Sequence, residues 1–167
     1  SSAGTYYYGA SVQLNATVMT GYTWVNWTNT IAGTVFSATK NCTDPMPASD
    51  ISLTANAAVT NYTINYTLNG GTLPQGYPQS YTYFAAMPLQ NPTKTGYDFQ
   101  GWTGPNGSTA STDVTIPINS TGTKTYEAYW AVTSYTITYH DPQGVTSSNP
   151  TSYTIEETIG DTLTIGA

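Results

Sequence analysis

The stretch that decides the fold is GYDFQGW at residues 96–102, because the chain carries a related stretch, GYTWVNW, at residues 21–27. The two stretches lie 75 residues apart, and the same spacing aligns residues 6–8 with residues 81–83. Self-similarity at a fixed period is typical of proteins built from tandem units. We therefore expect small, similar domains in which each copy of the stretch forms a core strand.

Composition and residue alternation both favour β-structure. The sequence contains 15 Tyr, 4 Trp and 3 Phe residues in a Thr-rich chain, and these residue types are enriched in strands. Apolar and polar residues alternate with the period of two that a half-buried strand shows. Strands are expected at 6–18, 22–27, 51–57, 62–68, 81–89, 114–118 and 126–130. Pro117 and its β-branched neighbours leave little room for a helix at 108–120.

The repeat divides the chain into three parts. We expect a divergent β repeat at 1–59, a complete β repeat at 60–132 and a partial third repeat at 133–167. The junctions contain no Gly-, Pro- or Ser-rich spacer, so we expect short, stiff connections. The first repeat lacks a counterpart of the strand at 62–66, whereas the third repeat begins with one. We therefore expect one strand to be missing from the first repeat and an unmatched copy of it to be present in the third.

The charge of the chain excludes one class of partner. Three Lys residues, no Arg and nine carboxylates give a net charge of −6, whereas a nucleic-acid binder needs a basic patch. No apolar run approaches the roughly 18 residues of a membrane span, and the first residues lack the features of a signal peptide. We therefore expect a soluble segment whose export signal has been removed or lies outside it. The single Cys42 cannot form an intramolecular disulfide.

The residue types that carry catalysis are scarce and scattered. His140 is the single histidine and lies in no recognisable constellation with a Ser or Cys nucleophile. Asp44 and Asp50 flank a loop, and Glu156 and Glu157 lie near Asp161, but neither group has the alternating spacing of a calcium loop. We predict no catalytic residues, no metal site and no cofactor.

The second repeat resembles the Listeria-Bacteroides repeat, the family of the internalin B-repeats. The stretches that carry the resemblance are 62–66, 69–71, 92–102 and 126–130. The first repeat is similar to a divergent form of the family through 9–14, 21–27 and 46–55. The resemblance implies small β-grasp-like domains in tandem on secreted or wall-attached microbial proteins, where they act as stalks and adhesive modules without catalytic residues. The near absence of Lys and Arg argues against acidic partners such as glycosaminoglycans.

These observations favour a non-enzymatic structural segment of an extracellular surface protein. A narrower hypothesis is a fibre subunit, in which the C-terminal tail of one molecule supplies the missing first strand of the next. The residues predicted to take part are Tyr135, Ile137, Tyr139, Tyr153 and Ile155. The other interpretation of the mismatch is a piece cut from a longer array of covalently joined repeats.

Two further kinds of site are considered. The alternative function is an adhesin module that binds carbohydrate or a host receptor by stacking on exposed aromatic rings, with Tyr6, Tyr7 and Tyr8 as candidates. Asn-X-Ser/Thr sequons suggest N-glycosylation, although several would arise by chance in a Thr-rich chain. They begin at Asn15, Asn26, Asn41, Asn61, Asn65, Asn106 and Asn119.

Overall fold

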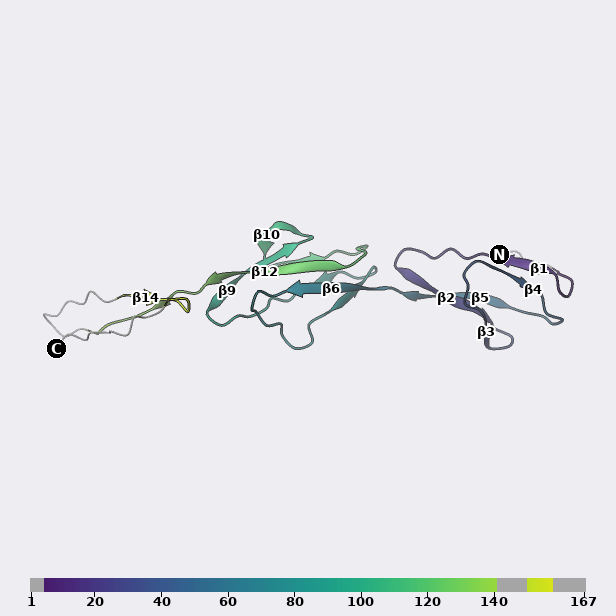
Figure 1. Ribbon diagram of the computed structural model, residues 1–167, viewed down its shortest axis with the longest axis horizontal. Coiled ribbons are helices and arrows are strands. Elements are labelled where there is room, and N and C mark those ends of the chain that lie inside the picture. The colour runs from purple at the N-terminus through teal and green to yellow at the C-terminus, as the bar shows by residue number, and fades with distance from the viewer. Residues whose placement is uncertain (1–4, 141–149, 158–167) are drawn as a thin grey trace. The chain divides into compact units, whose positions relative to one another are not determined.

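The computed structural model describes residues 5–140 and 150–157, and the regular elements in these ranges are all β-strands (Figure 1). The predicted mostly-β class is confirmed, while the β-grasp-like arrangement stays a prediction. The strands are β1 (Ser11–Leu14), β2 (Tyr22–Asn29), β3 (Thr34–Ser37), β4 (Cys42–Pro45), β5 (Leu53–Val59), β6 (Asn61–Thr67), β7 (Ser80–Thr82), β8 (Met87–Pro88), β9 (Tyr97–Gly104), β10 (Gly107–Ser111), β11 (Thr115–Ile116), β12 (Lys124–Val132), β13 (Tyr135–Thr136) and β14 (Ser152–Tyr153).

Backbone contacts divide the chain into two compact units. Unit 1 comprises Ser1–Tyr62 together with Thr82–Ala86 and Pro117–Thr121, and the remaining segments form unit 2. Two short segments of the second sequence repeat therefore pack with unit 1. The repeat boundaries at 59/60 and 132/133 describe the sequence and stay predictions. Below, repeat 1, repeat 2 and repeat 3 denote 1–59, 60–132 and 133–167.

Unit 2 is built on a five-stranded sheet with the order β10-β9-β12-β6-β7. Its central strand, β12, has neighbours on both edges: β9 runs antiparallel to it and β6 runs parallel to it, with Lys124 opposite Ile64 and Glu127 opposite Thr67. After β6 the chain turns, since Asn69 has a φ of 50° and the Gly71 amide donates to the Leu68 carbonyl at 3.0 Å. A chain that turns here can leave the sheet and return as β7.

The repeated stretch occupies the same place in both units. In unit 2 it forms β9, where Trp102 lies opposite Ala128 and a bulge separates that pairing from Phe99 opposite Trp130. In unit 1 it forms β2, where Trp27 lies opposite Ala55 and a bulge again separates that pairing from Trp24 opposite Ala57. The two similar stretches thus pair with their neighbouring strands in the same register. Residues of repeat 1 and repeat 2 can therefore be matched one to one along these strands.

The two units differ at one edge. Unit 1 has a three-stranded sheet with the order β3-β2-β5, so β5 pairs with β2 alone among the described residues. Its counterpart β12 pairs with two strands. The difference is the absence from repeat 1 of a strand equivalent to β6. One edge of β5 is consequently left unpaired in the described part of the chain.

The cores differ accordingly. Unit 2 buries Trp102, Tyr81, Ile116, Tyr126, Ala128, Ile64, Val114, Leu89 and Tyr77. In unit 1 the one described apolar side chain that is buried to the same degree is Met46. Residues from β6 and from the loop that follows it cover the sheet of unit 2, and without them the sheet of unit 1 stays partly open.

Two of the expected strands are corrected. The strand expected at 6–18 is regular over β1 alone, which pairs with β4, because residues 6–8 have no strand beside them within the described chain. The strand expected at 81–89 is divided into β7 and β8, which belong to different sheets. The rings of Trp27 and Trp130 are half-buried, whereas Trp102 is fully enclosed. The indole N–H group of Trp27 donates to the Lys40 carbonyl at 3.0 Å, and that of Trp130 donates to the Leu68 carbonyl at 2.9 Å.

Candidate assembly site

Each repeat contains one short segment that starts with Tyr, here called its tyrosine segment: Tyr6–Tyr8, Tyr81–Tyr83 and Tyr153–Ile155. The first and third of these contain most of the residues predicted from the sequence to assemble or to bind a ligand. Their structural environments show what repeat 1 lacks.

The tyrosine segment of repeat 2 lies beside β6. The Ile64 amide donates to the Gln79 carbonyl at 2.8 Å, and the Tyr66 hydroxyl donates to the Pro78 carbonyl at 2.9 Å. Tyr81 is 1% exposed and its hydroxyl donates to the Gly122 carbonyl at 2.6 Å. In this setting the segment is an edge strand whose first ring is part of the core.

Aromatic packing explains why β6 matters to that core. Tyr66 packs against Tyr77, Trp102 and Tyr126, with ring centroids 4.7, 5.4 and 6.5 Å apart. Burial raises the pKa of Tyr77 to about 12 and raises the pKa of Tyr66 as well. The hydroxyls of this cluster are therefore neutral hydrogen-bonding groups at physiological pH.

Repeat 3 makes the same backbone arrangement a second time. The Ile137 amide donates to the Thr151 carbonyl at 2.8 Å, and the Tyr139 hydroxyl donates to the Pro150 carbonyl at 3.0 Å. These bonds correspond one to one with those of Ile64 and Tyr66 in repeat 2. Strand β13 is thus a structural copy of the start of β6.

The structure places two of the five predicted assembly residues on the strand pair β13–β14 and the other three in the segments that follow these strands. Tyr135 lies opposite Tyr153 with the two rings 5.3 Å apart, and Ile137 and Tyr139 follow β13. The rings of Tyr135 and Tyr153 are 39% and 38% exposed, and Ile155 is 52% exposed. The pair therefore carries an apolar surface that its own repeat does not enclose.

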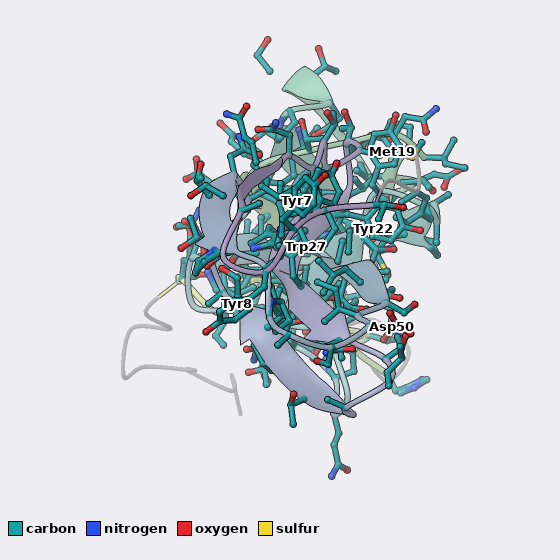
Figure 2. All side chains as sticks on the ribbon, turned by 90° about the vertical axis from the view of Figure 1, so that its right-hand side faces the viewer. Tyr7, Tyr8, Met19, Tyr22, Trp27 and Asp50 are labelled. Carbon is teal, nitrogen blue, oxygen red and sulfur yellow. The ribbon has the colours of Figure 1, made fainter. Side chains whose placement is uncertain are left out.

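The tyrosine segment of repeat 1 is the most open of the three. Tyr6, Tyr7 and Tyr8 are 54%, 88% and 80% exposed. Figure 2 looks onto unit 1 and shows Tyr7 and Tyr8 as separate, outward-lying side chains. The turn that follows matches that of repeat 3, since the Ala10 amide donates to the Tyr7 carbonyl at 3.0 Å and the Glu157 amide to the Thr154 carbonyl at 3.3 Å. Tyr6 therefore corresponds to Tyr153, and Tyr8 to Ile155.

One feature of the site has a role that was not predicted from the sequence: the glycine turn with which the repeated stretch begins. It is Met19–Tyr22 in repeat 1 and Lys94–Tyr97 in repeat 2, each closed by a hydrogen bond of 3.1 Å from the Tyr amide. The glycine carbonyl of each turn also accepts a hydrogen bond: Gly21 from the Thr60 amide at 2.8 Å, and Gly96 from the Thr133 amide at 2.9 Å. Its constant position in the repeat is the signal that could have found it.

The predicted sequons differ in their suitability for a glycan. Asn15, Asn41, Asn61, Asn65 and Asn119 are exposed. Asn26 is half-buried, and its side-chain oxygen accepts from Asn56 at 2.9 Å and from Thr28 at 3.2 Å. The Asn106 amide nitrogen donates to the Trp102 carbonyl at 2.9 Å. Asn26 is half-buried and Asn106 uses its Nδ2 atom, to which a glycan would be attached, as a hydrogen-bond donor, so the other five are the better candidates.

The catalytic and metal-binding residue types stay dispersed. His140 is exposed and Cys42 is half-buried. Across residues 5–140 and 150–157, no three His, Cys, Asp or Glu side chains lie close enough together to hold a metal ion. The same part of the chain contains no helix that is long and apolar enough to cross a membrane.

Comparison with known families agrees with the repeat pattern. Residues 62–128 match the Listeria-Bacteroides repeat domain, and residues 1–59 match the divergent InlB B-repeat domain. Searches of curated proteins and of solved structures give no match. Repeat domains of these families are typical of bacterial surface proteins and are generally non-enzymatic structural modules.

Proposed function

Because this chain belongs to the family of the Listeria-Bacteroides repeats, we propose that it is a non-enzymatic structural segment of an extracellular surface protein, and that it assembles head to tail. In this assembly the strand at residues 135–140 of one molecule pairs with β5 of the next. The observation that carries the proposal is the unpaired edge of β5, whose counterpart in unit 2 is covered by β6.

The edge of β5 has none of the features that prevent strand addition. Residues 51–54, the counterparts of the residues of β12 that pair with β6, read ISLT and contain no charge and no proline. Natural proteins usually protect an exposed edge with Lys, Pro or a covering segment. Residues 135–139 read YTITY and are also uncharged, so the two strands can pair without removing a charge from water.

The register of the added strand follows from unit 2. There, Lys124 lies opposite Ile64 and Tyr126 lies opposite Tyr66. The same relation places Ile137 opposite Ile51 and Tyr139 opposite Leu53 of the neighbouring molecule. Ile137 and Tyr139 would then cover the sheet around Trp27, as Ile64 and Tyr66 cover it around Trp102.

The contact is expected to be weak, because Ile137 and Tyr139 are already half-buried and association costs about 4–15 kcal/mol in lost freedom of motion. Backbone hydrogen bonds to the added strand offset part of this cost, at about 0.5–1.5 kcal/mol each. We therefore expect assembly to depend steeply on protein concentration.

The test compares the intact chain with a variant that lacks residues 133–167, by sedimentation velocity and electron microscopy. The intact chain should form head-to-tail polymers and the truncated chain should stay monomeric. The point variant Ile137→Asp should also lose assembly, whereas Thr138→Asp, at an exposed position on the other face of the strand, should retain it. Equal assembly by the intact and truncated chains would reject strand donation, and the remaining explanation would be a longer covalent array.

A second candidate function is an adhesin module that binds carbohydrate or a host receptor. The exposure of Tyr7 and Tyr8 supports it, since aromatic rings stack on the apolar faces of sugars. A glycan array should then show binding that is lost in Tyr7→Ala. The control Ile31→Ala, which alters an exposed side chain elsewhere in unit 1, should retain it. If no glycan on the array is bound and Tyr7→Ala leaves cell attachment unchanged, this role is excluded.

A further inference from the structure

The glycine turn and the tyrosine segment of the following repeat form one recurrent contact. A Cβ atom placed on Gly21 would lie 2.7 Å from the Cβ of Tyr83, and one placed on Gly96 would lie 2.8 Å from the Cγ2 of Ile155. Both distances are too short for any side chain, so each glycine lets the residue at the same position of a tyrosine segment pack directly onto the backbone.

The residues beside each glycine strengthen this contact. The ring of Tyr22 packs against Phe84 with centroids 4.9 Å apart. In the other instance the hydroxyl of Tyr97 donates to the Glu156 carboxylate at 2.7 Å. The same two positions of the repeat therefore make either an aromatic contact or a hydrogen bond.

Repeat 1 contains the third version of this contact surface without its partner. Its tyrosine segment places Tyr8 where Tyr83 and Ile155 stand, yet Tyr8 is 80% exposed and Tyr7 is 88% exposed. The contact geometry identifies what would cover Tyr8: a glycine turn followed by Tyr. The chain offers two such turns, of which Lys94–Tyr97 is adjacent to β13.

We propose that the Gly96 turn, together with β13, is the docking surface for Tyr6–Tyr8 of a second copy of this chain. In the isolated molecule, residues 152–156 cover this surface and act as a removable cap. The proposal rests on the strand addition proposed above and names the second contact that accompanies it. Tyr6 would replace Tyr153 opposite Tyr135, and Tyr8 would replace Ile155 on Gly96.

The exposure of the cap reduces the free energy needed to remove it. Tyr153 and Ile155 are 38% and 52% exposed while bound, so part of their apolar surface is already in water. The incoming segment has a Tyr at each of its three positions, and an aromatic ring buries a larger area than Thr154 or Ile155. Exchange of the segments also breaks the hydrogen bond from Tyr97 to the exposed Glu156, because Gly9, which takes its place, has no side-chain acceptor.

A reversible disulfide can hold the cap in place. Thr136 and Ser152 lie opposite one another on the antiparallel pair, at the Cα separation of about 4.5–5.5 Å that a disulfide accepts. Both are exposed, so Thr136→Cys with Ser152→Cys in a Cys42→Ser background should leave the fold intact. The bond would prevent residues 152–156 from leaving β13.

The experiment measures polymer mass by sedimentation for this double-cysteine protein with and without reductant. We expect polymers in the reduced protein and at least a tenfold smaller polymer fraction in the oxidised protein. The Cys42→Ser background alone should assemble equally in both conditions. Equal assembly of the oxidised and reduced proteins would overturn cap displacement and leave strand addition standing, whereas absence of polymers in the wild-type chain would overturn both.

A second variant tests the docking residue itself. Tyr8→Ser should raise the concentration needed for assembly at least tenfold without changing the secondary structure seen by circular dichroism. Ile31→Ser removes another exposed apolar side chain of unit 1 and should leave assembly unchanged. Equal behaviour of these two variants would show that Tyr8 has no docking partner.

Discussion

At the scale of the residue, Trp27 and Trp102 occupy the same position of the repeated stretch but have different surroundings. Trp102 is 0% exposed, and within the described residues its indole N–H has no acceptor. Trp27 is half-buried and donates to the Lys40 carbonyl. The equivalence could be predicted from the sequence, but the difference could not, because it depends on a strand that repeat 1 does not supply.

Substitution of Trp102 should separate the stabilisation that its ring provides from the destabilisation caused by its buried N–H group. Trp102→Ala should lower the free energy of unfolding by about 3–5 kcal/mol, since it leaves a large cavity. Trp102→Phe should cost much less than Trp102→Ala, because it also removes a buried donor whose desolvation costs about 1–3 kcal/mol. Denaturant unfolding followed by circular dichroism measures both, and an equal loss in the two variants would contradict this account.

Gly96 should tolerate a side chain less well than a glycine with open surroundings. Gly96 and Gly76 have φ values of 76° and 79°, so Ala should cost about 1–2 kcal/mol at either position. Only at Gly96 would the new Cβ meet Ile155, since nothing lies within 4 Å of the Cβ position at Gly76. Hydrogen exchange of residues 152–156 should therefore accelerate in Gly96→Ala and not in Gly76→Ala. Equal exchange in the two variants would mean that the cap does not depend on this contact.

The buried tyrosine cluster should make unit 2 sensitive to alkali. Burial raises the pKa of Tyr77 to about 12, whereas the unfolded chain loses this proton near the ordinary value of about 10. The free energy of unfolding should thus be unaffected by this group below pH 10 and should fall as the pH rises from 10 to 12. Denaturant titrations across this range should show a smaller fall in Tyr77→Phe. An identical pH dependence in that variant would contradict the assignment.

At the scale of the element, the repeated stretch and the alternating residues predict the long strands β2, β5, β6, β9 and β12. The alternation could not show that residues 6–8 fail to continue β1, because a strand needs a neighbour to pair with and the sequence pattern records only side-chain character. The contact between the glycine turn and the next tyrosine segment was missed for a similar reason. It depends on the close approach of a side chain to the glycine backbone, for which glycine is a necessary but unspecific signal.

The unpaired edge of β5 should be visible as weak protection of its amides. In a dilute solution of monomers, residues 51–54 should exchange their amide hydrogens faster than their counterparts 124–127, which pair with β6. The comparison is internal, since both strands belong to one molecule and share a register with their repeated stretch. Equal protection of the two strands would mean that another segment covers β5.

At the scale of the whole molecule, we propose that repeat 1 and repeat 3 are complementary parts of one domain. Among the described residues, repeat 1 has the sheet without a counterpart of β6, and repeat 3 has a copy of the start of β6 without such a sheet. A contact of this kind is head-to-tail and does not close on itself, so it extends into a filament. That outcome suits a structural segment of a surface protein better than it suits an enzyme.

The most direct measurement is a cross-link that reports the register of the added strand between two molecules. The geometry of unit 2, with Thr125 opposite Asn65, places Ser52 of one molecule opposite Thr138 of the next. Two single-cysteine proteins, Ser52→Cys and Thr138→Cys, each in a Cys42→Ser background and distinguished by a mass tag, are mixed and oxidised. We predict a disulfide-linked heterodimer, and much less of it when Thr136→Cys replaces Thr138→Cys. Homodimers alone, or equal yields from the two mixtures, would contradict strand addition at β5.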